Sequence, residues 1–234
     1  MARHPRCIFP GVALHVRQRG VDGMACFRVD GDYLLYLTHL RHVAAKYECE
    51  LHAYCLMTNH VHLLLTPPAP DACGLMIRDL GCSYVRYFNG RHGRTGTLWE
   101  GRYRACLVES PAYVLGCYRY IENNPAHARM VDHPRDYRWS SYAANTGMRE
   151  ETMVKPHCEY LALSEHLVAR QAAYRGLFET PLNEGVIKAI RDATYGGYAL
   201  VSDAFKSRFG VKTERRKPGP RAEMPQGVYE LEAT

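Results

Sequence analysis

The sequence predicts an α+β fold in which a ferredoxin-like antiparallel sheet packs against helices. Four segments have the composition of strands, and three segments place apolar residues at helical spacing. Turn residues separate these segments. Their order is strand, helix, strand, strand, helix, strand, followed by a third helix. This order is that of the split β-α-β motif.

The first half of this unit contains three strands and one helix. Residues 12–19 predict a strand that glycines end, and residues 32–46 predict a helix with leucines at helical spacing. Residues 51–57 and 60–66 predict two strands joined by a short turn, and a proline-rich segment ends the second one.

The second half adds a helix, a strand and a further helix. Residues 71–88 have helical spacing, and residues 99–108 have strand composition. The serine–proline pair at 110–111 supplies a good N-cap and a good first helical residue. We expect this helix to end at Asn124, because the proline that follows disfavours the helical conformation at that residue.

The remaining chain predicts a linker and further helices. The linker covers residues 145–156, and the expected helices are 160–178, 184–193 and 199–209. The last two helices, joined through a pair of glycines, could form a helix-turn-helix, although a simple helical packing unit is the stronger interpretation.

The charge of the chain indicates a polyanionic partner. The 234 residues carry a net charge of +6, and 24 of the 30 basic residues are arginine. Residues 1–149 hold 18 basic against 12 acidic residues, whereas residues 150–234 hold 12 of each. Arginine binds phosphate through two parallel hydrogen bonds, so nucleic acid is the simplest partner. A solvated basic surface is the alternative.

The cysteines and the hydropathy indicate a cytoplasmic protein. The nine cysteines are scattered without a Cys-x-x-Cys pair, which favours reduced thiols over a disulfide framework or a zinc ribbon. The chain has no run of eighteen apolar residues and no secretory leader, so we expect no membrane association.

The tripeptide His60-Val61-His62 lies at the start of a predicted strand. Because side chains alternate along a strand, His60 and His62 point to the same face and could bind a divalent metal ion. Two exposed strand histidines are the ordinary alternative. The apolar surroundings of the pair, with Val61, Leu63 and Leu65 on the opposite face, make the metal site the better interpretation.

A second feature lies on the helix that begins at residue 111. Tyr120 and Asn124 are one turn apart and share a face. A divalent ion held by His60, His62 and the Asn124 amide oxygen would polarise a phosphate, and Tyr120 would attack it as a nucleophile. This ligand set favours Mg²⁺ or Mn²⁺ over zinc. Tyr120 could instead be a packing residue, as most helix tyrosines are.

Several segments, in this order, resemble the REP-associated tyrosine transposases, a subgroup of the HUH single-strand transposases. The resemblance spans residues 12–145 and rests on five matched segments: His15-Val16-Arg17-Gln18-Arg19-Gly20, Ala53-Tyr54-Cys55-Leu56-Met57-Thr58-Asn59-His60-Val61-His62, Thr97-Leu98-Trp99-Glu100-Gly101-Arg102-Tyr103, Tyr120-Ile121-Glu122-Asn123-Asn124-Pro125 and Tyr137-Arg138-Trp139-Ser140-Ser141-Tyr142. The chain departs from the family after Pro125, where Ala126-His127-Ala128 replaces the usual Val-Arg-Ala.

This resemblance implies a domain organisation and an activity. Residues 1–147 would be the catalytic domain with the HUH nuclease core, residues 148–211 a helical region of unassigned role, and residues 212–234 a polar, mobile tail. His60 and His62 would bind the metal, Asn124 would be the third ligand and Tyr120 the nucleophile. The enzyme would cut single-stranded DNA next to hairpin-forming repeats through a 5′-phosphotyrosine link.

Further residues are candidates for DNA contact. Basic and aromatic side chains in the matched segments could contact phosphates or stack on bases: Arg17, Arg19, Trp99, Arg102, Arg104, Trp139 and Ser140. The protein would act as a monomer or a homodimer. Two alternatives stay open: a domesticated protein that binds repeat DNA or structured RNA without cutting it, and a metal-dependent hydrolase that uses water as the nucleophile.

Overall fold

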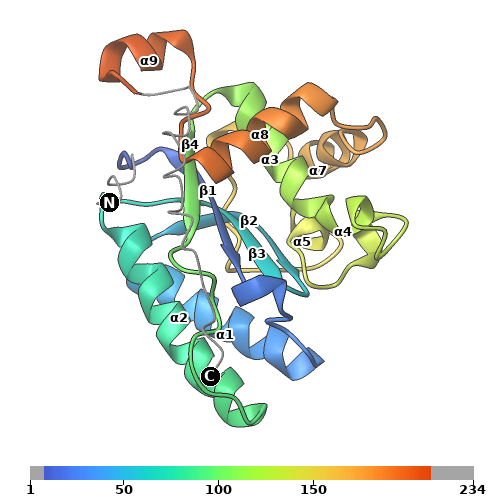
Figure 1. Cartoon of the computed structure of the whole chain (residues 1–234). Coiled ribbons are helices and arrows are strands. Elements are labelled where there is room, and N and C mark those ends of the chain that lie inside the picture. Colours follow the sequence, from blue (N-terminus) through green and yellow to red (C-terminus); the bar gives the residue numbers. More distant parts are fainter. Residues whose placement is uncertain (1–7, 212–234) are drawn as a thin grey trace, which may run out of the picture.

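The computed structural model describes residues 8–211 of the chain. They contain a sheet of four antiparallel strands in the order β2-β3-β1-β4 (Figure 1). The strands are β1 (Ala13–Arg19), β2 (Glu50–Met57), β3 (His60–Thr66) and β4 (Arg104–Val108). This order and the intervening helices are those of the split β-α-β motif, so the predicted fold class is confirmed.

Two long helices cover one face of the sheet. Helix α1 (Asp30–Lys46) connects β1 to β2, and helix α2 (Ala72–Arg91) connects β3 to β4 (Figure 1). The helices pack on each other, and an aromatic cluster joins them, with Tyr36 and Tyr84 in edge-to-face contact at 5.0 Å between ring centroids. This side is a conventional apolar core.

The opposite face is also covered, by α3 (Pro111–Glu122) and α8 (Glu184–Gly196). Helix α3 contacts β2 and β3, and α8 contacts β1, β4 and α3, so the two helices lie together over the sheet (Figure 1). An antiparallel sheet of this kind often leaves one face in water. Here α3 and α8 bury that face, and α8 comes from the C-terminal third of the chain.

The remaining elements are short. After α3 come α4 (Asn124–His127), α5 (Tyr142–Asn145), α6 (Cys158–Leu161), α7 (Leu167–Gly176) and α9 (Asp203–Phe209), with 3₁₀ turns η1 (Val21–Gly23) and η2 (Pro134–Asp136). Of these, α4 and α6 contact α3. The segment before α9 makes a parallel bridge from Leu200 to Val108 of β4. In residues 8–211, no helix combines the length and the apolar character needed to cross a bilayer.

Several element boundaries differ from the sequence-based predictions, including the start of the last helix, which is Asp203 rather than residue 199. The last strand begins at Arg104 rather than at residue 99, because Gly101 has a positive φ of 67° and interrupts the pairing, which leaves Trp99 in an isolated bridge to Gly20. The helix expected at 160–178 is two helices, α6 and α7, separated by residues 162–166. In this connection the Ser164 hydroxyl accepts a hydrogen bond from the backbone N–H of His166, the residue before α7.

The end of α3 is a further difference. The helix stops at Glu122, and Asn124 begins the separate turn α4, which contains Pro125. Proline fits the first turn of a helix, so the chain resumes a helical path after a break at Asn123. The expected boundary between residues 147 and 148 stays a prediction, and the tail 212–234 lies outside the described residues.

Gly20 supports the end of β1 that lies next to the histidines. Its backbone N–H donates to the Asn59 carbonyl in the β2–β3 turn, and a Cβ at this position would lie 2.3 Å from the Met24 carbonyl oxygen. Since both atoms in that contact are fixed to the backbone, no side-chain rotation can relieve it.

We predict that Gly20→Ala lowers the free energy of unfolding by about 1–3 kcal/mol, the usual cost of forcing extra volume into a packed site. Gly90→Ala is the matched control: Gly90 lies on an exposed part of α2 with open space where a Cβ would lie, so alanine should raise stability by up to about 1 kcal/mol. Urea denaturation measures both changes. Equal stability of Gly20→Ala and wild type would contradict the close contact.

Candidate active site

The pairing of β1 with β3 brings histidines and arginines to one face of the sheet. His62 lies opposite Arg17, and His60 lies opposite Arg19. Directly opposed residues of antiparallel strands point to the same face, and alternation along β1 adds His15 to it. Helices α3 and α8 cover this face, so a polar cluster lies beneath them.

Each histidine of the HxH pair has one ring nitrogen held by a hydrogen bond. His60 Nδ1 lies 2.7 Å from Asn59 Oδ1, and His62 Nδ1 lies 2.8 Å from His15 Nε2. The rings of His60 and His62 are 4.9 Å apart between centroids. The Nε2 atoms of both rings are therefore left for another partner on the same side of the sheet.

The three histidines are neutral at physiological pH. Burial, followed by the charges of nearby arginines, lowers the pKa of His60 to about 4, although a hydrogen bond with the Asn124 side chain acts in the opposite direction. Burial lowers the pKa of His15 to about 3 and that of His62 well below its ordinary value. Neutral imidazole is the form that binds metal ions.

Tyr120 on α3 faces the histidines. Its ring centroid lies 5.7 Å from that of His62 and 5.7 Å from that of His15. Burial raises the pKa of Tyr120, while a hydrogen bond and the positive charge of Arg191 on α8 act in the opposite direction. The phenol is protonated at neutral pH, and the residue is only 8% exposed.

Asn124 completes the group one turn after Tyr120. Its Nδ2 donates to the Tyr120 carbonyl over 2.8 Å, which orients the amide. The side chain also interacts with the ring of His60. The structure therefore brings together all four side chains that the sequence singled out as nucleophile and metal ligands: Tyr120, His60, His62 and Asn124.

The chemistry of these donors fits a divalent ion held only in part by protein. The rings of His60 and His62 lie together, and the Asn124 side chain interacts with His60. Residues 8–211 contain no group of three or more His, Cys, Asp and Glu side chains that could hold a metal. A site with so few protein ligands suits an ion whose coordination is completed by water and substrate oxygens. Zinc sites of either the structural or the catalytic kind use at least three His, Cys or carboxylate ligands, and residues 8–211 offer no such group, so zinc fits poorly.

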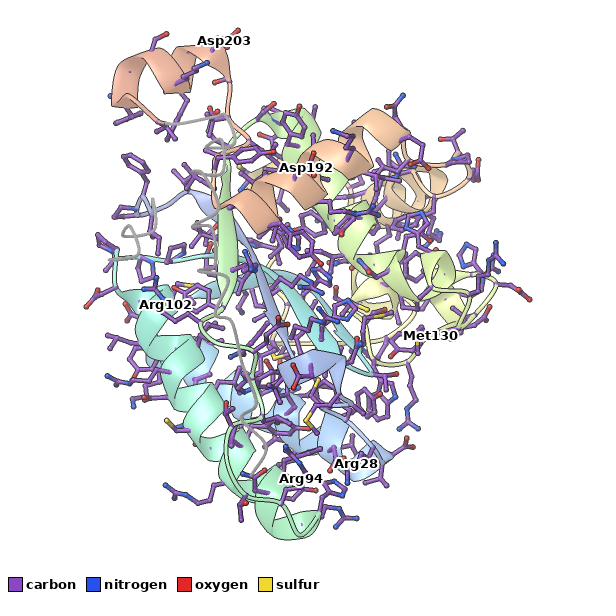
Figure 2. The ribbon with its side chains drawn as sticks, in the orientation of Figure 1. Arg28, Arg94, Arg102, Met130, Asp192 and Asp203 are labelled. Atoms are coloured by element: carbon purple, nitrogen blue, oxygen red, sulfur yellow. The ribbon has the colours of Figure 1, made fainter. Side chains whose placement is uncertain are left out.

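Arginines lie next to the histidines and Tyr120, on the side of the site that faces β4 and α8. Arg17 lies 4.9 Å and Arg104 5.6 Å from the ring centroid of Tyr195, and Arg104 also donates to the Tyr195 carbonyl over 2.7 Å. A cavity of about 390 Å³ lies beside them, lined by residues 100–105 and 194–197. Arg102 belongs to this lining and lies beside the first turns of α2 (Figure 2). Arg19 forms an ion pair with Glu100.

Two residues predicted to stack on bases are packed against other side chains in this structure. Trp139 is stacked on Tyr33 at 4.5 Å, and the Arg138 guanidinium lies 4.1 Å from its ring centroid. Trp99 is 7% exposed among aromatic rings. Tyr33 and Arg138 thus lie against the Trp139 ring, whereas the aromatic neighbours of Trp99 lie at 6.1 and 6.4 Å between ring centroids.

Ser140, another residue predicted to contact DNA, is part of the packing at the edge of the sheet. It is buried, donates to the Tyr137 carbonyl and pairs with Cys55 across a β-bridge. Its segment thereby adds to the edge of β2.

A buried carboxylate fixes α3 in place. Glu122 Oε1 accepts hydrogen bonds from Ser141 Oγ at 2.6 Å and from Asn145 Nδ2 at 2.7 Å, while Oε2 accepts from the Tyr174 hydroxyl at 2.6 Å. Burial raises the pKa of Glu122 to about 7, and the three hydrogen bonds act against that rise. Glu122 thus connects the helix that carries Tyr120 to α5 and α7.

Sequence reasoning missed four residues of this neighbourhood: His15, Glu122, Arg191 and Thr194. His15 and Glu122 lie inside motifs that were singled out, and strand alternation places His15 on the face of Arg17. Arg191 and Thr194 have no signal in the sequence, because only the folded chain brings α8 to the sheet.

We predict that Glu122 makes stability depend on pH. Because the folded pKa of about 7 exceeds the ordinary 4.5, the folded state binds the proton more tightly. The stabilisation is therefore present below pH 4.5 and is lost as pH rises to 7, by roughly 3 kcal/mol for a shift of this size.

Urea denaturation of wild type and Glu122→Gln from pH 4.5 to 8 measures this loss. The free energy of unfolding of wild type minus that of the variant should fall with pH and level off above 7. A difference that stays constant over this range would mean that Glu122 ionises at its ordinary pKa.

Comparison with known proteins identifies the fold and the family that this region resembles. Residues 28–124 match the family described as Transposase IS200 like. A solved structure of a REP-associated tyrosine transposase bound to a REP hairpin aligns with a TM-score of 0.54 and 14% identity, over 67% of this chain and 99% of that one. A Deinococcus radiodurans R1 protein assigned as a transposase aligns with a TM-score of 0.36 and 21% identity, over 53% and 97%.

No curated protein matches the chain. The resemblance read from the motifs is nonetheless confirmed by the family match and by the solved structure. Residues 28–124 thus match the IS200-like transposase family, and the chain shares its fold with a solved REP-associated tyrosine transposase.

Proposed function

We propose that the chain is a metal-dependent endonuclease and strand transferase that cuts single-stranded DNA next to hairpin-forming repeats through a covalent 5′-phosphotyrosine intermediate. One observation carries the proposal. The Tyr120 ring lies 5.7 Å from the His62 ring on a buried face, with Asn124 and His60 beside them. A nucleophile next to a cluster of neutral metal-binding donors suits phosphoryl transfer.

His60, His62 and Asn124 would hold Mg²⁺ or Mn²⁺. When bound, such an ion supplies Lewis-acid polarisation of the scissile phosphate. The neutral imidazoles would bind through Nε2, since each Nδ1 already has a hydrogen-bond partner. The hydrogen bond from Asn124 to the Tyr120 carbonyl would keep the amide oxygen directed away from the helix.

Tyr120 would carry out the chemical step. Its hydroxyl oxygen forms a bond to phosphorus, the phosphorus–O3′ bond breaks, the phenol loses its proton, and the departing 3′ oxygen gains one. The charge of Arg191 favours the phenolate that develops. The number of phosphoester bonds is conserved, so a 3′-hydroxyl can reverse the reaction and join strands.

The arginines near Tyr195 would bind the DNA backbone. Arg17 and Arg104 lie opposite each other on β1 and β4 next to the histidines, and Arg102 lines the adjacent cavity. Arg19 continues the row along β1. A hairpin as the recognised element is supported by the solved relative, which is bound to a REP hairpin.

We predict that Tyr120→Phe keeps DNA binding and loses the covalent adduct, to below about 1% of wild type, because the attacking hydroxyl is removed and the ring that packs is kept. The assay incubates labelled hairpin DNA with a single-stranded flank and Mn²⁺, followed by a denaturing gel. Tyr118→Phe is the control. Tyr118 lies on the same helix, but its hydroxyl accepts from the His157 backbone, away from the histidines, so adduct formation should continue.

Other outcomes of the assay separate the alternatives. Cleavage without an adduct that persists in Tyr120→Phe would assign a water-dependent hydrolase. Binding by wild type with neither cleavage nor adduct would assign a non-cleaving repeat-binding protein.

We also predict that Mn²⁺ affinity changes little with pH. A His60 pKa of about 4 and a His62 pKa that burial lowers well below its ordinary value leave both rings neutral at pH 6. The Kd from titration calorimetry should change less than about threefold between pH 6 and 8, whereas two histidines of ordinary pKa would lose roughly 15-fold. His60→Ala should abolish the binding. A 15-fold loss at pH 6 would contradict the buried, neutral pair.

A further inference from the structure

We propose that Thr194 of α8, acting through His15, sets the ring tautomer of His62 and so makes the C-terminal region part of the active site. Thr194 and His15 are positioning residues in this proposal. Its functional meaning rests on the proposed function, in which His62 binds the metal. The predicted tautomer of His62 is independent of the proposed function.

The Thr194 hydroxyl is the first link in a chain of hydrogen bonds. Its single proton is donated to the Ile190 carbonyl one turn earlier in α8, over 2.8 Å. Thr194 Oγ1 also lies 2.8 Å from His15 Nδ1. Since the hydroxyl has no second proton, Thr194 can only accept in this contact, and His15 must carry its proton on Nδ1. The oxygen has a second lone pair toward the Cys106 thiol at 3.3 Å.

The proton on His15 decides the state of His62. A neutral imidazole that carries its proton on Nδ1 has only a lone pair on Nε2. His15 Nε2 lies 2.8 Å from His62 Nδ1, so His62 must donate from Nδ1. The Nε2 lone pair of His62 is then free to bind a metal ion. Hydrogen bonds that fix the orientation and tautomer of a ligand histidine in this way are common in metal sites.

Burial makes this chain of hydrogen bonds a strong constraint. His15, His62 and Thr194 are at most 2% exposed, so water cannot replace a lost partner. The two imidazole rings are stacked at 5.0 Å with an interplanar angle of 17°. Changing the tautomer of one ring alone would place two protons or two lone pairs between the rings, so the two rings change tautomer together. The reversed pair would leave the lone pair of His15 Nδ1 facing the Thr194 oxygen, whose proton is donated to Ile190, which costs free energy in a buried site.

His60 provides an internal comparison. Its Nδ1 faces Asn59 Oδ1, and the Asn59 amide is oriented because its Nδ2 donates to the Gly23 carbonyl over 3.1 Å. His60 therefore has the same tautomer for a reason that involves neither α8 nor His15. A change in α8 should alter His62 and leave His60 unaffected.

Different parts of the chain thus fix the two tautomers: Asn59, between β2 and β3, fixes that of His60, and α8 fixes that of His62 through His15. Helix α8 comes from a region whose role the sequence could not assign, and it lies more than a hundred residues after His62. It reaches the sheet beside α3, across β4 and β1 (Figure 1). Asp192, two residues before Thr194, marks the position of α8 in Figure 2.

The test compares Thr194→Val with Thr194→Ser in the full chain. Valine keeps the shape but removes the hydroxyl, so the Nδ1 proton of His15 loses its acceptor. Moving that proton to Nε2 relieves the loss, and His62 must then accept at Nδ1 and carry its own proton on Nε2. Serine retains the hydroxyl and should behave as wild type.

Nitrogen-15 NMR of the imidazoles in metal-free protein reads the tautomers directly. We expect protonated Nδ1 on both His60 and His62 in wild type and Thr194→Ser. In Thr194→Val, His62 should shift to protonated Nε2 while His60 stays unchanged. Mn²⁺ affinity, measured by calorimetry, should fall about tenfold or more in Thr194→Val and by less than threefold in Thr194→Ser.

Three results would overturn the inference: protonated Nε2 on His62 in wild type, an unchanged His62 tautomer in Thr194→Val, or unchanged Mn²⁺ affinity in that variant. If Thr194→Val does not fold, the wild-type spectrum and His15→Gln decide, since the glutamine oxygen can accept from His62 and should preserve its Nδ1 proton. Failure of the proposed function has a different signature. Wild type would then form no adduct with DNA, although the tautomers are as expected.

Discussion

The register of β1 against β3 determines which side chains share the buried face of the sheet. It sets Arg17 opposite His62 and brings His15 within hydrogen-bond distance of the same ring. A shift by one residue would turn the histidines toward α1 and α2 and the leucines toward α3. The apolar packing of Leu63 and Leu65 on the other side therefore holds the polar cluster in position.

Burial then gives this cluster its chemical character. Desolvation keeps the imidazoles neutral and the Tyr120 phenol protonated, and it makes every hydrogen bond around them directional. The cover over the face consists of α3, which carries Tyr120, and α8, which carries Thr194 and Arg191. Glu122 ties α3 to α5 and α7, so the position of the nucleophile depends on the chain that follows it.

The C-terminal third of the chain consequently contributes side chains to the candidate site and to the sheet. Leu200 bridges β4, Tyr195 lies between Arg17 and Arg104, and Thr194 contacts His15. The sheet face that α1 and α2 leave uncovered is thus completed from residues 184–201. The same residues line one side of the cavity next to the arginines.

The sequence by itself determined the fold class, the strand pair with His60 and His62, and the helix with Tyr120 and Asn124. These features depend on local periodicity, on the position of proline and on strand alternation, all of which are patterns among residues close together in the sequence. Tertiary structure alone decided that Trp139 and Ser140 are buried, that the last strand starts after Gly101, and that Thr194 contacts His15. Those outcomes depend on contacts between residues up to 179 positions apart, for which a single sequence carries no local signal.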